Sequence, residues 1–378
     1  MLSNKKIIVG HGHSSIEVCH SLVPLFQASK KLGIKFAFID YHFKNLNQVA
    51  GDLLILVRKY HHISPNFERI VGELSALRRN FSKIIYFDDA AAVSNILFPI
   101  LDYVDQYWVR GLLVEKKLYS KSFYGGHLFS DYYHNLYNIL DDAPYFQPAP
   151  VKPEFDSKIK VAWNLGIGCF PSLGSVHLNK NYKTLRKLAT ASTILPISLV
   201  SYPVIKLYFD AMVNSLKEPI LNFNKRKASV SARFSHLAYR KSIGYQRLLA
   251  SQMLSKEQWA LTGRVPNQQY MLELTELRGL LSPYGWGEIC YRDFEAALFG
   301  MMLAKPDMSH IETWPNIYAD NCYFPLDWDF GNLKELCHKV EDWQEASLLV
   351  ENARKVYLQG LLSAQDRAIS MISSVFDS

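Results

Sequence analysis

Short apolar runs alternate with stretches of helical periodicity over most of the chain. This pattern predicts strands separated by helices, an alternation typical of parallel, doubly wound α/β sheets. In the first part of the chain the expected strands are Lys6–Gly10, Ile34–Asp40, Asp52–Val57, Lys83–Phe87 and Gln106–Arg110. Because open parallel sheets bind ligands at the carboxyl ends of their strands, the residues that follow these strands are the first candidates for a site.

The alternation is interrupted once and then resumes. The segment Gln147–Pro153 contains three prolines and cannot continue a helix or a central strand, so it predicts an interdomain linker. Later strands are expected at Lys158–Trp163, Ala228–Phe234, Trp259–Thr262, Gly279–Leu281 and Met302–Lys305, and from Leu333 onward the chain reads as helical. Since 378 residues exceed the usual size of one core, the sequence predicts two α/β domains.

The most distinctive motif lies between Leu281 and Pro306. A loop with the sequence Tyr-Gly-Trp-Gly, residues 284–287, precedes a predicted amphipathic helix. On that helix Cys290, Phe294, Ala297, Leu298 and Met301 share an apolar face, and Glu288, Arg292 and Glu295 form a stripe on the opposite face. Glycines let the loop turn sharply, and the helix start favours an anionic group. The motif therefore suits a nucleotide sugar, although an exposed ladder of charges would give the same spacing.

This pattern, continued by Ala, Gly and a strand with Lys-Pro, resembles the donor-binding motif of GT-B glycosyltransferases, most closely the exostosin-like and bacterial surface-polysaccharide transferases. The resemblance covers Val230 to Tyr318. It implies two Rossmann-like, doubly wound domains facing a central cleft: residues 1–150 on the acceptor side, residues 151–355 on the donor side, and a final helix, 356–378, that crosses back. In many retaining members two glutamates stand eight apart, one near the donor sugar and one on the ribose. Here Glu288 and Glu295, seven apart, match those places.

Arginines after two strands extend the predicted donor site. Arg233 ends one predicted strand and Arg264 follows another, where a guanidinium can hold a diphosphate bidentately in place of a metal. The resemblance also supports Arg233, and either arginine could instead cap a helix or pair with a surface acid. The complete predicted donor-binding set is Arg233, Arg264, Tyr284, Gly285, Gly287, Glu288, Arg292 and Glu295.

Candidate catalytic groups follow strands of the first domain. His11 and His13 come after the first strand, and Asp88 and Asp89 after the fourth; each is of a type that can act as the base of an inverting transfer. The alternatives are loop hydrogen bonding for the histidines and N-capping of a following helix for Asp89. Glu288 completes the predicted catalytic set. Residues 129–137 are rich in tyrosine, which suits either stacking on acceptor sugars or packing between domains.

The net charge and the cysteines of the chain limit which partners and which cellular compartment are expected. The net charge is +7, and seven Lys and Arg residues lie between Lys225 and Arg247, which suits donor phosphates, an anionic membrane surface or nucleic acid. No nucleic-acid module accompanies them, so no nucleic-acid partner is expected. The five scattered cysteines form no metal-ligand pattern and indicate a reducing compartment. Without a secretory signal or a membrane-spanning run, we expect a cytoplasmic protein, with peripheral contact at the inner membrane face left open.

These observations predict a metal-independent glycosyltransferase with no cofactor, which uses a nucleotide sugar as co-substrate. It would transfer the sugar to a growing surface polysaccharide or a lipid-linked glycan. Two alternatives remain at this point: another GT-B activity such as a sugar-nucleotide epimerase, or a non-catalytic GT-B module that binds nucleotide or glycan in a polysaccharide assembly complex.

Overall fold

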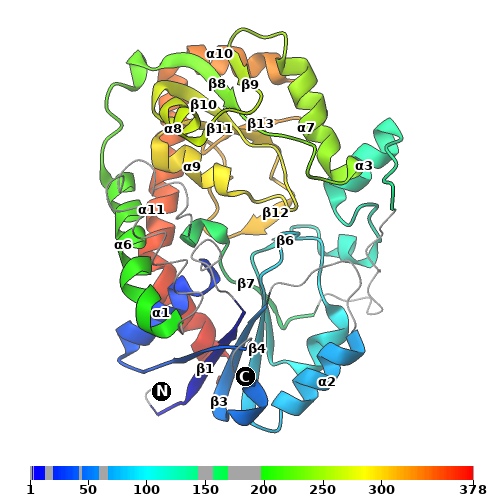
Figure 1. The fold of residues 1–378 in the computed structure, drawn as a ribbon, viewed down its shortest axis with the longest axis vertical. Helices are drawn as coiled ribbons and strands as arrows, with labels where there is room; N and C mark the ends of the chain where they lie inside the picture. Colours follow the sequence, from blue (N-terminus) through cyan, green and yellow to red (C-terminus); the bar gives the residue numbers. More distant parts are fainter. Residues whose placement is uncertain are drawn as a thin grey trace.

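The computed structural model describes residues 2, 4–12, 20–41, 45–58, 67–143, 156–168 and 197–377, with side chains of the helix at 197–217 described from residue 206 onward. Within these ranges the chain forms two parallel sheets with helices packed around them (Figure 1). The predicted linker and His13 lie outside the described residues.

The first sheet has the strand order β2-β1-β3-β4-β5-β7, with every pairing parallel. Its strands are β1 (Ile7–His11), β2 (Ala37–Asp40), β3 (Gly51–Arg58), β4 (Phe81–Asp88), β5 (Gln106–Val109) and β7 (Ile159–Val161). Its helices are α1 (Val23–Leu32) and α2 (Phe67–Leu77), and the 3-10 turns η2 (Leu46–Gln48) and η3 (Phe98–Tyr103) complete the connections. The central strands are buried on both faces, as their continuous apolar runs predict.

The second sheet has the order β13-β11-β10-β8-β9, again all parallel. Its strands are β8 (Lys227–Ala232), β9 (Ala260–Thr262), β10 (Leu277–Leu281), β11 (Met302–Pro306) and β13 (Phe324–Leu326). The helices of this half are α7 (Lys241–Leu254), α8 (Asn267–Glu276), α9 (Tyr291–Phe299) and α10 (Leu333–Glu341).

Both sheets follow one connectivity. When the strands of each sheet are numbered in chain order, both sheets contain the spatial order 2-1-3-4-5. The chain therefore reverses direction between β1 and β3 in the first half and between β8 and β10 in the second. Such a reversal opens a crevice at the carboxyl ends of the two strands. The predicted fold class, two Rossmann-like doubly wound domains, is confirmed by these sheets.

Two expected elements differ from prediction. The strand at Lys158–Trp163, expected to open the second half, pairs instead with β5 and forms the edge of the first sheet. A short strand has no sequence signal for its partner, so the pairing is decided by tertiary contacts. The motif helix starts at Tyr291, because Cys290 and Asp293 form a capping box, and it ends at Gly300, where φ is 65°. Glu288 therefore precedes the helix, and the predicted stripe is wrong at that residue.

Two features join the halves. Strand β6 (Gly111–Leu113) pairs antiparallel with β12 (Ile311–Thr313), which brings the two halves together as a small ribbon (Figure 1). The long helix α11 (Trp343–Ser374) packs against α1 in the first half and α9 in the second, and also against α6 (Ile197–Lys217). No helix in the described part of the chain is both long and apolar enough to cross a membrane.

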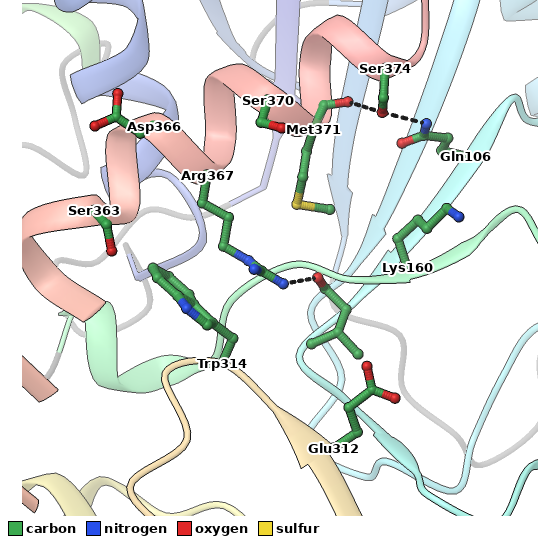
Figure 2. A pocket seen from close by; sticks show the side chains of 11 residues that line it. Gln106, Lys160, Glu312, Trp314, Ser363, Asp366, Arg367, Ser370, Met371 and Ser374 are labelled. Carbon is green, nitrogen blue, oxygen red and sulfur yellow. Dashed lines mark hydrogen bonds between the residues drawn. The ribbon is translucent and has the colours of Figure 1, made fainter. Parts of the chain in front are cut away.

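The end of α11 borders a pocket of about 600 Å³ beside the edge of the first sheet (Figure 2). Arg367 donates to the carbonyls of Val161 and Ala162, both at 2.6 Å, and lies over the ring of Trp314. These bonds cover carbonyls at the end of the edge strand β7, so they fasten α11 to the first half.

Candidate functional site

The carboxyl ends of the two sheets face the same region of the molecule. In the first half this edge carries His11 at the end of β1 and Asp88 at the end of β4. In the second half it carries Arg233 after β8 and the loop of residues 282–290 after β10, which we call the motif loop. The carboxyl edges of both sheets thus carry residues that the sequence predicts for the site.

The motif loop touches the first half directly. A Cβ atom built on Gly287 would lie 1.9 Å from the carbonyl oxygen of Ala91, in the segment that follows β4. The next residue, Glu288, accepts a hydrogen bond from the backbone N–H of Val93 at 3.3 Å. The loop that the sequence assigns to a donor therefore also forms the junction between the halves.

Gly287→Ala is expected to push the halves apart at this junction and to lower the free energy of unfolding by about 1 to 3 kcal/mol, the usual cost of overpacking. The matched control is Gly285→Ala, because a Cβ there meets no atom closer than 3.4 Å. Urea unfolding of both variants tests this. Equal stabilities would show that the junction is not as close as described.

Glu288 lies in a buried polar cluster at the junction. Its Oε1 atom is 3.8 Å from Nδ1 of His127, the residue that precedes α3 (Leu128–Tyr137), and His310 lies beside them. Burial by itself would raise the pKa of Glu288, but the two histidines lower it. Burial also lowers the pKa of His310. Among the described residues, Oε1 of Glu288, Nδ1 of His127 and both ring nitrogens of His310 lack hydrogen-bond partners, so a bound hydroxyl would find donors and acceptors here.

A second buried network holds the base of the motif loop. Lys305 and Asp293, both fully buried, form an ion pair at 3.1 Å. The carboxylate also accepts from the hydroxyls of Ser282 and Tyr318 and from the N–H of Cys290. Because Lys305 balances the charge of Asp293, the start of α9 carries no uncompensated acid and stays favourable to an anion.

Arg247 also holds the motif loop, through bonds to the loop's backbone carbonyls. Its guanidinium donates to the carbonyls of Tyr284 at 2.5 Å and Pro283 at 3.2 Å, and burial lowers its pKa. Tyr284 itself is fully buried and donates its hydroxyl to Asp307 O at 2.5 Å. It packs on Phe129 of α3, with ring centroids 4.7 Å apart. The structure thus places Tyr284 between the halves.

The two remaining charges of the predicted stripe, Arg292 and Glu295, lie on α9. Glu295 accepts a hydrogen bond from the hydroxyl of Tyr270 at 2.6 Å, and Arg292 donates to Arg233 O at 3.0 Å. Both side chains are half-buried. Burial lowers the pKa of Arg292, but Tyr270 and Glu295 outweigh it, so the pKa is raised. This environment differs from that of a solvated charge ladder.

The two strand-end arginines differ. Arg233 forms a bidentate ion pair with Glu273 at 2.9 and 2.7 Å and also donates to Thr262 O. Its guanidinium is thus engaged by a carboxylate of α8. Arg264 is exposed in the loop after β9. Of the two, Arg264 has the side chain that a diphosphate could reach without breaking an ion pair.

The candidate catalytic residues of the first half that the structure describes are buried, and both aspartates accept hydrogen bonds. Asp88 accepts from the hydroxyl of Tyr107 and from Ala90 N at 3.0 Å, and burial raises its pKa to about 7. Asp89 accepts from Arg110 and from Nε2 of His20 at 2.8 Å. His11 is also buried. Both aspartates are thus brought to the predicted edge as members of hydrogen-bond networks.

Several residues of these networks were not selected from the sequence. They are His20, Tyr107, Arg110, His127, Arg247, Tyr270, Glu273, Tyr291, Asp293, Lys305, His310 and Tyr318. Asp293 and Lys305 stood inside the recognised motif, and the buried position of a Lys within an apolar strand was a usable signal. The histidines are far apart in the sequence, and no local pattern marks them.

The basic region between Lys225 and Arg247 is divided by the fold. Arg226 donates to the carbonyls of Phe299 and Gly300, Arg233 pairs with Glu273, and Arg247 is buried. Within the described ranges, no three His, Cys, Asp or Glu side chains gather as a metal site would require.

No family model matches the sequence, and neither does any curated protein. The solved structures that match this chain include glycosyltransferases. One, from Rickettsia africae ESF-5, is 11% identical over 99% of both chains, with a TM-score of 0.47. An alpha-glucosyltransferase in complex with UDP and DNA is 8% identical over 99% of both chains, with a TM-score of 0.44. Anabaena HepE, in complex with UDP and glucose, is 11% identical over 98% of this chain and 100% of its own, with a TM-score of 0.39. Such low values assign neither a family nor an activity to this chain.

Proposed function

We propose that the protein is a GT-B glycosyltransferase of the exostosin-like or bacterial surface-polysaccharide type. It transfers a sugar from a nucleotide-sugar donor to a growing surface polysaccharide or a lipid-linked glycan, without a metal, at the cytoplasmic side of the membrane.

One observation carries the proposal. The motif loop and the start of α9 lie at the reversal point of the second sheet and contact the carboxyl edge of the first through Gly287 and Glu288. Ligands of open α/β sheets bind at such points. A ligand here would meet a helix start and Arg292 on one side, which suit phosphate, and buried carboxylate and imidazole groups on the other, which suit sugar hydroxyls.

Within this proposal two clusters of residues bind different parts of the donor. Glu295, held by Tyr270, accepts hydrogen bonds from the ribose, and Arg264 with the start of α9 faces the diphosphate. Glu288, with His127 and His310, faces the donor sugar. In this assignment Tyr284, Gly285 and Gly287 shape the loop, while Arg233 keeps α8 beside β8 through Glu273.

A panel of nucleotide sugars tests the proposal, with UDP-sugars first because two of the similar structures hold UDP. A true donor at a hundred times its dissociation constant should stabilise the protein by about 2.7 kcal/mol, seen as a rise in melting temperature. Acceptor-dependent release of nucleotide then separates a transferase from an epimerase or a scaffold. If no nucleotide sugar raises the melting temperature, the proposal fails.

Glu295→Gln is expected to weaken donor binding by about 1.5 to 3 kcal/mol, because a charged acceptor of ribose hydrogen bonds is lost. The fold should stay intact, since Gln can still accept from Tyr270. Calorimetric titration of the donor into both proteins measures the difference. Equal affinities would remove Glu295 from the site.

Turnover is expected to persist in EDTA. We expect Arg264, Arg292 and the start of α9 to neutralise the leaving diphosphate. Initial rates with and without chelator test this. A rate that falls in EDTA and returns with magnesium or manganese would contradict metal independence.

A further inference from the structure

The pocket at the end of α11 lies apart from the candidate site. It borders the edge strand β7, at the side of the first sheet, whereas the candidate site lies at the carboxyl ends of β1 and β4. Both halves line it, with Lys160 of β7 from the first and Glu312 of β12 from the second. Figure 2 shows α11 along one side of the pocket, with these two residues on the other. Its volume of about 600 Å³ is within the range of small-molecule sites.

The charged side chains of the pocket leave an excess of positive charge. Glu312 already pairs with Lys116 at 2.9 Å. Asp366, the other acid of the lining, pairs with Lys31 at 2.5 Å. Lys160, in contrast, is exposed and makes no ion pair or hydrogen bond with any residue that the structure describes. An anionic ligand would therefore meet a cation whose charge no neighbouring acid balances.

Hydrogen-bond donors of α11 also remain available in the pocket. Arg367 uses Nε and Nη2 for the carbonyls of Ala162 and Val161, which leaves Nη1 without a partner in the described part of the chain. Ser370, three residues further along α11, is exposed and makes no hydrogen bond with the described residues either. Guanidinium, ammonium and hydroxyl groups donate well to phosphate and carboxylate oxygens. The pocket thus has the composition of an anion site.

The rest of the lining suits the ring and hydroxyls of a sugar. Trp314 and Met371 supply apolar surface, and the guanidinium of Arg367 lies 4.7 Å from the centre of the Trp314 ring. Each of the two acids pairs through one oxygen, so Oε1 of Glu312 and Oδ2 of Asp366 can still accept from a hydroxyl. The cavity is also much larger than a single phosphate or carboxylate group, so a ligand that fills it has a body as well as a charge.

We propose that this pocket is a second ligand site, which binds a small sugar that carries a phosphate or a carboxylate. Lys160, Nη1 of Arg367 and Ser370 bind the anionic group. Glu312 and Asp366 accept hydrogen bonds from the sugar hydroxyls. The inference does not rest on the proposed function, because none of these residues belongs to the predicted donor or catalytic set.

Calorimetric titration of the full chain with glucose 6-phosphate and with glucuronate tests the proposal. At least one of them should bind with a dissociation constant of about 1 mM or tighter, and the tighter ligand identifies the preferred anionic group. Glucose tests the need for charge and inorganic phosphate the need for a sugar body, and each should bind about tenfold more weakly or worse. If neither charged sugar binds this tightly, or if either control loses less than tenfold, the proposal is overturned.

Lys160→Gln locates the bound sugar. It should weaken binding of the preferred ligand by about tenfold or more, because a charge-assisted hydrogen bond is lost. The matched control is Lys334→Gln on α10, which removes the same charge from another exposed lysine and should leave the affinity within about twofold. Equal effects of the two substitutions would place the sugar elsewhere and overturn the assignment.

Ser370→Trp obstructs the pocket from α11 without changing the charge. Because Ser370 is exposed, the fold should be kept, and an unchanged melting temperature checks this. The indole should occupy the space of the ligand and weaken its binding by about tenfold or more. A smaller loss in the folded variant would show that the sugar does not enter this pocket.

Discussion

Asp293→Ala is expected to lower the free energy of unfolding by about 3 to 5 kcal/mol, the largest effect of any single substitution proposed for this protein. Its partner Lys305 is fully buried, so the variant leaves an ammonium group without a counter-charge inside the second half. Tyr318, Ser282 and Cys290 also lose the oxygen to which they donate. Chemical denaturation measures the loss.

The double variant Asp293→Ala, Lys305→Met provides the control. Removing both charges removes the uncompensated cation, and paired replacement of buried ions often costs little. We therefore expect the double variant to be more stable than Asp293→Ala alone. If adding Lys305→Met destabilises Asp293→Ala further, the ion pair does not account for the effect.

Asp88→Asn is expected to make the protein more stable than wild type by a few kcal/mol at neutral pH. Burial raises the pKa of Asp88 from 3.8 to about 7, while the bonds from Tyr107 and Ala90 act in the opposite direction. Between pH 4 and 7 the unfolded chain has lost this proton and the folded chain keeps it. Wild-type stability therefore falls as pH rises through this window, by about 1.4 kcal/mol for each unit of pKa shift. Asn has no proton to lose and avoids this cost.

Urea unfolding of both proteins at pH 4.5 and 7.5 tests the sign. The difference in unfolding free energy should move in favour of Asp88→Asn as pH rises. Other groups titrate equally in both proteins, so they cancel in the difference. A constant difference across this range would show that Asp88 ionises normally in the folded protein.

Local sequence patterns predicted most elements of the fold. The apolar runs that became β1, β3, β4, β8 and β11 could be recognised because strands buried on both faces are continuously hydrophobic. The sheet to which β7 belongs could not be predicted, since three residues carry no information about their neighbours. The start of α9 was also missed. Its position depends on the capping box of Asp293, whose carboxylate is in turn held by Lys305 of the next strand.

The candidate site likewise has some features that the sequence predicts and others that only the tertiary structure fixes. The sequence by itself predicts that ligands bind at the residues that follow the strands, because the carboxyl ends of parallel strands lie at one edge of a sheet, and the glycines of the motif loop allow a close approach. Only the tertiary structure decided which charges are engaged. It joined Arg233 to Glu273, Asp89 to Arg110 and His20, and Glu288 to His127 across the halves. Burial and charge pairing depend on distance in space, so residues far apart in the chain acquire their chemistry only when loops at the carboxyl edges of the two sheets come into contact.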